Sequence, residues 1–187
     1  MDVLEAIRSR RSIRKFKTDP IPDDLLIKIL DAGRWAPSGS NIQPWLFIVV
    51  KDPKILKLVK MFSPGLFGDP PVVIAICSDK KRAFEVGGEL ARDYLTVTDC
   101  SMAAQNMMLA AHALGLGTCV IKSFSAQAIK KILKLPKHIE PELLLSIGYP
   151  DEQPSPPLRR PLEEITFLDE YGKPFIQRRV SSHEQCQ

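Results

Sequence analysis

The residues best suited to anion chemistry are gathered near the start of the chain. Arg10, Arg11 and Arg14 flank the hydroxyl of Ser12. Guanidinium groups offer forked N–H donors and a hydroxyl offers a short donor, a combination that suits a phosphate dianion. The alternative interpretation of the same residues is a solvated basic helix end.

Two further stretches carry polar groups between apolar runs. Arg159 and Arg160 lie in a proline-stiffened segment and could close a phosphate site from a second side. The stretch from Pro37 to Trp45 supplies serine, asparagine and glutamine side chains together with a glycine backbone. Such groups could bond the edge of a polar heteroaromatic ring, although a simple helix-to-strand turn has the same composition.

A long apolar helix, expected over about residues 90–114, is the element around which these stretches must be placed. Its second half, from Met102 onward, is hydrophobic on nearly every side, which is typical of an interior or an interface. About 25 residues at 1.5 Å each give a rod of roughly 37 Å. Gly115 and Gly117 then predict a tight return into a strand at 119–121.

The remaining elements follow from periodicity, caps and prolines. Asp2 predicts the N-cap of a short first helix, and Pro20 and Pro22 introduce a second helix that Trp35 ends. Two more helices are expected at 53–61 and after Ser125, and strands at 45–50, 72–77, 119–121 and 142–149. The strands are apolar without alternation, so we expect helices on both faces of their sheet.

Composition narrows the class of protein. The 187 residues suit one domain, and the net charge of +4 is spread along the chain, so charge gives no argument for nucleic acid. No apolar run is long enough to span a bilayer and no signal peptide is evident, so we expect a cytoplasmic protein that does not bind membranes. Cys77, Cys100 and Cys119 are expected as reduced core residues, and the scattered histidines predict no metal site.

Taken together, the stretches at 10–16, 36–45, 110–118 and 159–165 resemble the FMN-dependent nitroreductase family over about residues 2–165. The resemblance implies an α+β fold: a three-layer α/β/α sandwich with a mostly antiparallel central sheet and the long helix at a dimer interface. It implies a homodimer with FMN at the subunit interface, which passes hydride from NAD(P)H through the flavin to nitro compounds, quinones or a similar small acceptor. Residues 1–165 would be the FMN-binding domain, and residues 166–187 a C-terminal extension that embraces the partner.

The resemblance also assigns roles to individual positions. Positions that would hold the phosphate, ribityl chain and pyrimidine end of the flavin match Arg10, Arg11, Ser12, Arg14 and Arg159. Positions that would reach the flavin from the partner subunit match Pro37, Ser38, Gly39, Asn41 and Gln43. Backbone groups near the reactive edge of the ring match Val120, Ile121 and Lys122. No side-chain acid or base is required, because the cofactor carries the hydride chemistry.

Other functions remain open at this stage. Residues 61–71 are short and rich in proline and glycine, and the helical lid of longer family members has no counterpart there, so an open site is expected. Iodotyrosine deiodinases and the flavin-fragmenting enzyme of vitamin B12 lower-ligand synthesis have a similar layout, but their lid motifs are not recognised in this chain. A basic binding module for RNA or DNA is the non-enzymatic alternative, and its binding would depend on salt.

Overall fold

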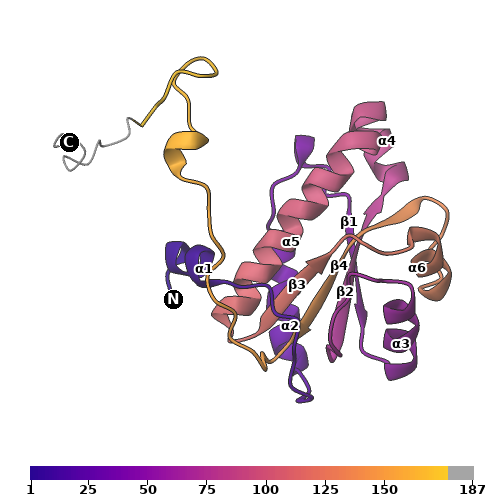
Figure 1. Ribbon diagram of the computed structural model, residues 1–187. Helices are drawn as coiled ribbons and strands as arrows, with labels where there is room; N and C mark the ends of the chain where they lie inside the picture. The colour runs from indigo at the N-terminus through magenta and orange to yellow at the C-terminus, as the bar shows by residue number, and fades with distance from the viewer. Residues whose placement is uncertain (177–187) are drawn as a thin grey trace. The chain divides into compact units, whose positions relative to one another are not determined.

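The computed structural model describes residues 1–176 and divides into two units, Met1–Pro154 and a second unit that begins at Ser155. The first unit holds every strand of the sheet (Figure 1). Among residues 1–176, no helix is both long and apolar enough to cross a membrane.

The sheet has four antiparallel strands in the order β1-β2-β4-β3. These are β1 (Trp45–Val50), β2 (Val72–Asp79), β3 (Gly117–Ile121) and β4 (Ile139–Gly148). The central strands β2 and β4 are buried along almost their whole length, which explains why neither alternates polar with apolar residues. The four strands expected from the sequence are confirmed, and three of them are longer than expected. β3 is an edge strand, and its start is close to the segment that follows the first helix.

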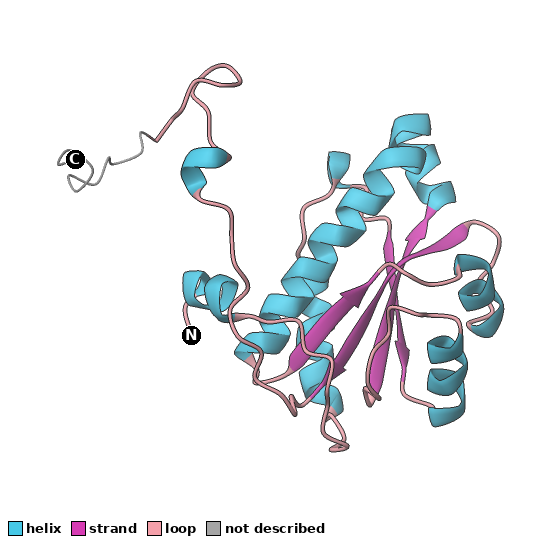
Figure 2. Cartoon of the chain, viewed as in Figure 1, coloured by secondary structure: helices cyan, strands magenta, loops and turns pink. Residues whose placement is uncertain are grey.

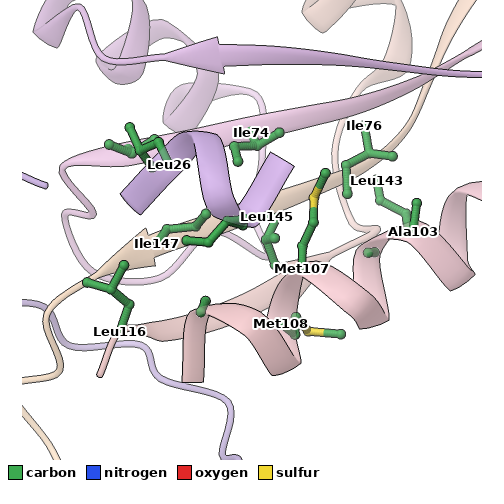
Figure 3. Close-up of a cluster of buried hydrophobic side chains, with 14 of the residues drawn as sticks. Leu26, Ile74, Ile76, Ala103, Met107, Met108, Leu116, Leu143, Leu145 and Ile147 are labelled. Atoms are coloured by element: carbon green, nitrogen blue, oxygen red, sulfur yellow. The ribbon is translucent and has the colours of Figure 1, made fainter. Parts of the chain in front are cut away.

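Helices cover both faces of the sheet (Figure 2). On one face, α2 (Asp23–Arg34) and α5 (Thr96–Ala113) bury Leu26 and Met107 against Ile74 and Leu145 (Figure 3). On the other face lie α3 (Pro53–Met61) and α6 (Ala126–Ile132), whose buried side chains meet the alternate residues of the same strands. The predicted three-layer α/β/α sandwich is therefore confirmed.

The long helix differs in detail from the expectation. α4 (Lys80–Leu90), which the sequence reading missed, runs through a π-helical turn at Ala91–Leu95 into α5, with a break at Gly88 (φ +65°). The sequence predicts that the apolar half of α5 lies in an interior or at an interface, and two of its residues lie in the interior of the single chain. Ala104 and Met108, at 1% and 8% exposure, belong to the core of their own subunit because α2 packs along this face. The resemblance implies that the long helix lies at a dimer interface, but these two side chains are already covered within one chain.

The first helix leaves an apolar stripe uncovered. α1 (Val3–Ser9) begins at Asp2, whose carboxylate accepts the Glu5 N–H at 2.9 Å, as the sequence predicts. The helix packs on α5 but buries only Ala6. Its large apolar side chains Val3, Leu4 and Ile7 are 51% to 65% exposed in the single chain.

The second unit contains little regular structure between Ser155 and residue 176. A short 3-10 turn, Leu162–Glu164, is its one named element. Leu158, Tyr171 and Phe175 are all more than 60% exposed, so this unit does not bury its own apolar groups. The predicted extension at 166–187 lies partly outside the described residues.

Cys77, Cys100 and Cys119 have free, buried thiols, as expected. Burial raises the pKa of Cys77 to about 12 and also raises that of Cys100, so neither thiol forms a reactive thiolate near neutral pH.

Candidate functional site

The arginine-rich segment is held along the free edge of β3. The Ile13 N–H donates to the Thr118 carbonyl at 2.9 Å, and Ser12 pairs with Thr118 in a parallel bridge. Farther along, the Lys17 N–H donates to the Tyr149 carbonyl at 2.9 Å. The arginine-rich segment is therefore fixed by backbone bonds to two distant parts of the chain.

Glu152 secures the same segment from the other side. Its carboxylate accepts the backbone N–H of Arg14 at 2.5 Å and that of Lys15 at 3.0 Å. These bonds, the one from Arg14 first, hold the pKa of Glu152 below its usual value. Both bonds end on Oε1, so they fix the carboxylate against the backbone of the arginine-rich segment.

Two glycines permit close contacts around this segment. A Cβ on Gly117 would lie 2.7 Å from the Ile13 side chain. The segment can therefore approach β3 this closely only because residue 117 has no side chain. Gly68 has φ +67°, and a Cβ there would meet the Arg14 carbonyl. The loop that contains Gly68 therefore lies against the backbone of Arg14, a predicted flavin-binding residue.

Arg10 and Arg11 line a cavity of about 460 Å³ at the C-terminal end of α5, together with His112 and Gly117. We call it the arginine cavity. Nη1 of Arg11 donates to the carbonyls of Arg8 and Arg10, both at 2.8 Å, and so caps the end of α1. Nε of Arg10 is buried and has no hydrogen-bond partner in the described part of the chain.

An anion in the arginine cavity would provide the acceptor that Arg10 lacks. An unpaired buried donor is costly, and natural proteins seldom retain one without a partner or a role. Since the guanidinium is charged, a phosphate oxygen satisfies it better than a neutral carbonyl. The residues present therefore fit the phosphate of FMN. The alternative of a merely solvated helix end describes Arg11 in part, but not the half-buried Arg10, whose Nε is buried.

The loop at residues 37–43, which we call the polar loop, has an unusual backbone. Ser40, Asn41 and Gln43 have φ of 48°, 56° and 50°, the left-handed region that residues other than glycine seldom occupy. Side chains stabilise this shape, since Ser38 Oγ accepts the Gln43 N–H at 3.0 Å and Gln43 Nε2 donates to Asn41 Oδ1 at 3.1 Å. Residues held in this region are found in tight turns and also cluster at ligand-binding sites.

A buried carboxylate on α5 anchors the polar loop. Asp99 is 2% exposed, and its Oδ1 accepts the Gly39 N–H at 3.3 Å, while its Oδ2 has no partner among the described residues. Burial raises the pKa of Asp99, and the bond from Gly39 partly opposes that rise. The loop and the helix are thereby coupled through a single polar contact.

The predicted segment 120–122 ends β3 beside a buried charge cluster. Val120 is 40% exposed and Ile121 is buried. Lys122 Nζ donates to the Glu142 carbonyl at 2.7 Å, and the Glu142 carboxylate also bonds Lys80 and Ser78, both at 2.7 Å. Burial alone would raise the pKa of Glu142, but the bonds from Lys80 and Ser78 hold it below its usual value.

The structure separates the predicted site residues into two groups within one chain. Arg10, Arg11 and the arginine cavity lie at the C-terminal end of α5, and the polar loop contacts Asp99 near its N-terminal end. Asp99 and His112 lie 13 positions apart on α5, which is about 20 Å along the helix axis.

Arg159 and Arg160 belong to the second unit and are exposed. Arg160 bonds the Glu164 carbonyl at 3.3 Å within that unit. Their assignment to a phosphate stays a prediction.

The sequence reading missed three polar residues of the site. Asp99 and His112 are polar residues in a largely apolar helix, a signal that could have marked both. Glu152 had no such signal, because its contacts are hydrogen bonds from backbone N–H groups 137 and 138 positions away in the sequence.

The fold is α+β, with an antiparallel sheet between two helical layers. A cationic cavity and a polar loop with positive φ angles lie at opposite ends of one helix, and the cavity is suited to an anionic ligand. The family model described as "Nitroreductase family" matches residues 7–64 and 57–149. The chain therefore belongs to the nitroreductase family, and the resemblance found in its sequence is confirmed.

Individual relatives agree with this assignment. A "Putative NADH dehydrogenase/NAD(P)H nitroreductase" of Methanothermobacter thermautotrophicus is 38% identical over 160 residues, which cover 82% of this chain and 80% of the relative. An "FMN reductase [NAD(P)H]" of Bacillus subtilis is 28% identical, covering 99% of this chain and 79% of the relative. The structure of a Vibrio harveyi NADPH:FMN oxidoreductase complexed with NAD+ has a TM-score of 0.82 and 26% identity, covering 91% of this chain and 78% of the other.

Proposed function

We propose that this protein passes hydride from NAD(P)H, through bound FMN, to small nitro compounds or quinones. Membership of the nitroreductase family makes it an NAD(P)H-dependent flavin oxidoreductase, and relatives named for FMN reduction support FMN as the cofactor. The observation that carries the proposal is the arginine cavity, where the buried Nε of Arg10 lacks an acceptor that a terminal phosphate would supply.

Bound FMN would supply the hydride chemistry, and the chain's own residues bind and orient it. Arg10, Arg11 and Ser12 are proposed to hold the phosphate end, with Arg14 toward the pyrimidine edge, where positive charge favours the reduced flavin. Backbone groups of residues 120–122 are proposed to line the reactive edge. Lys122 is tied down by Glu142, which would keep that backbone in place.

We also propose that the site is completed by a second copy of the chain. The polar loop and the arginine cavity are separated by about 20 Å along α5, so one chain cannot bring both to one end of a flavin. A two-fold partner with α5 antiparallel would place the polar loop of one subunit near the arginine cavity of the other. The uncovered stripe of Val3, Leu4 and Ile7 and the exposed apolar residues of the second unit offer surfaces for that contact.

The cofactor is tested on the purified protein. It should be yellow, and heat or acid should release FMN rather than FAD. The apoprotein should quench FMN fluorescence on titration, and oxidation of NADH and NADPH should be compared with a nitroaromatic and a quinone as acceptors. A colourless protein that does not quench FMN would overturn the proposal, and salt-dependent retention of a labelled oligonucleotide would then favour the binding-module alternative.

The dimer is tested by an exposed charge. Ile7→Glu places a carboxylate on the uncovered stripe of α1, where the single chain has no core to disrupt. Met61→Glu is the matched control, since Met61 is 65% exposed on α3, on the opposite side of the sheet. Sedimentation mass and flavin content should fall together in Ile7→Glu alone. A parent protein that sediments as a monomer with full flavin content would refute the composite site.

A further inference from the structure

His112, in the last turn of α5, makes a hydrogen bond that fixes its tautomer. Its Nε2 lies 2.7 Å from Ser9 Oγ, and the Ser9 hydroxyl is also 2.7 Å from the Glu5 carbonyl. A carbonyl can only accept, so the one hydroxyl hydrogen of Ser9 goes to Glu5. Ser9 Oγ must then accept from His112, and Nε2 carries the hydrogen. The nitrogen that gains or loses a proton is therefore Nδ1.

His112 lines the arginine cavity together with Arg10 and Arg11. The charged groups that face it are these two arginines, Glu5 on α1, and Glu152 across the cavity, whose carboxylate is bonded to the backbone. Burial and the two arginines lower the pKa of His112, against a smaller opposing effect of Glu5. Without an anion, these surroundings therefore favour the neutral form of the ring.

A dianion in the arginine cavity would reverse this balance. Opposite charge within about 4 to 6 Å favours the protonated form of a histidine, and would offset the repulsion from Arg10 and Arg11. Protonated Nδ1 then becomes a donor, and the cavity gains a further positive charge. The proton comes from solvent, and no other bond is made or broken.

We propose that His112 is a titratable third cation of the phosphate subsite, which takes up one proton from solvent when the phosphate of FMN binds. The inference rests on the proposed function and deepens it. It gives this flavin site a pH dependence that the arginines, which stay charged at all relevant pH values, cannot supply.

The test is proton uptake on binding, measured calorimetrically at pH 7.5 in buffers of different ionisation enthalpy. The parent apoprotein should take up about half a proton or more per FMN and none with riboflavin, which lacks the phosphate. Its affinity for FMN should fall with rising pH, at most about tenfold per pH unit. His112→Gln should lose the uptake, because the glutamine amide can still donate to Ser9 but does not titrate. His138→Gln, at an exposed position, is the matched control.

The outcomes separate the inference from the proposed function. If the parent does not bind FMN, the proposed function fails first. If the parent binds FMN without proton uptake, or if His112→Gln keeps the same uptake, the role of His112 is refuted. Should His112→Gln fail to fold, NMR titration of the histidine rings in the parent decides the question. The His112 pKa must rise on addition of FMN but not of riboflavin, and an unchanged value would overturn the inference.

Discussion

Replacing Arg10 tests the central element of the site, because it should change stability and affinity in opposite directions. In Arg10→Met the unbranched side chain keeps most of the packing and removes a buried N–H that has no acceptor. An unsatisfied buried donor costs about 1 to 3 kcal/mol, so the apoprotein should become more stable by up to that amount. For a domain of this size the midpoint of thermal unfolding would rise by roughly 2 to 4 °C for each kcal/mol.

Affinity for FMN should change in the other direction. A charge-assisted bond to phosphate contributes about 1.5 to 3 kcal/mol, so FMN should bind roughly 10 to 150 times more weakly. Riboflavin affinity should hardly change, because riboflavin lacks the phosphate that Arg10 is proposed to bind. With saturating FMN, the difference in the free energy of unfolding between Arg10→Met and the parent should become smaller or change sign, because the parent binds FMN more tightly and is stabilised more by it.

Apoprotein unfolding in urea and fluorescence titrations with FMN and riboflavin measure these changes on the same preparations. Arg8→Met is the matched control, because Arg8 lies in the last turn of α1, two positions before Arg10, with its side chain exposed, and it should leave both quantities unchanged. A variant that loses stability and both affinities together would show that Arg10 is structural. A variant that keeps full FMN affinity would show that the phosphate lies elsewhere.

Three further predictions concern other parts of the site. Arg159→Ala should weaken FMN binding about 10- to 150-fold with unchanged apoprotein stability, and retention of flavin through dialysis would instead point to Arg160. Asp99→Asn should keep flavin, because its amide oxygen can accept the Gly39 N–H, whereas Asp99→Ala should lose affinity by about 1 to 3 kcal/mol; equal flavin content in the two variants would contradict the anchoring role. The folded pKa of Glu142 is lowered, so its contribution to stability is present above its unfolded pKa of about 4.3 and is lost as the pH falls through the folded value. Glu142→Gln should therefore cost roughly 3 to 5 kcal/mol in urea unfolding at pH 7 and much less near pH 3, and an equal cost at both would refute this account.

Local spacing was sufficient for most of the fold. Runs of apolar residues predicted all four strands, Asp2 and Ser125 predicted helix starts, and both cap their helices through the side chain. The same local information failed for α4, where Gly87 and Gly88 interrupt the helical pattern and the chain is nevertheless helical on either side of the break. Local propensity is sufficient for elements whose pattern is uninterrupted. Tertiary packing decides the elements whose pattern is interrupted, such as α4.

The candidate site divides in the same way. The sequence by itself determined the hydrogen-bond donors. It contains arginines beside a serine, and it contains serine, asparagine and glutamine in a loop rich in turn-forming residues. Only the tertiary structure decided which groups meet: Ser9 bonds His112 across 103 positions, and Gly39 bonds Asp99 across 60. The register of β3 and the length of α5 determine these two contacts. As a result, the arginine cavity and the polar loop lie at opposite ends of one helix. The spacing of Asp99 and His112 in the sequence sets the distance between the two ends, but it does not show which segments contact each end, because those contacts are created by tertiary packing.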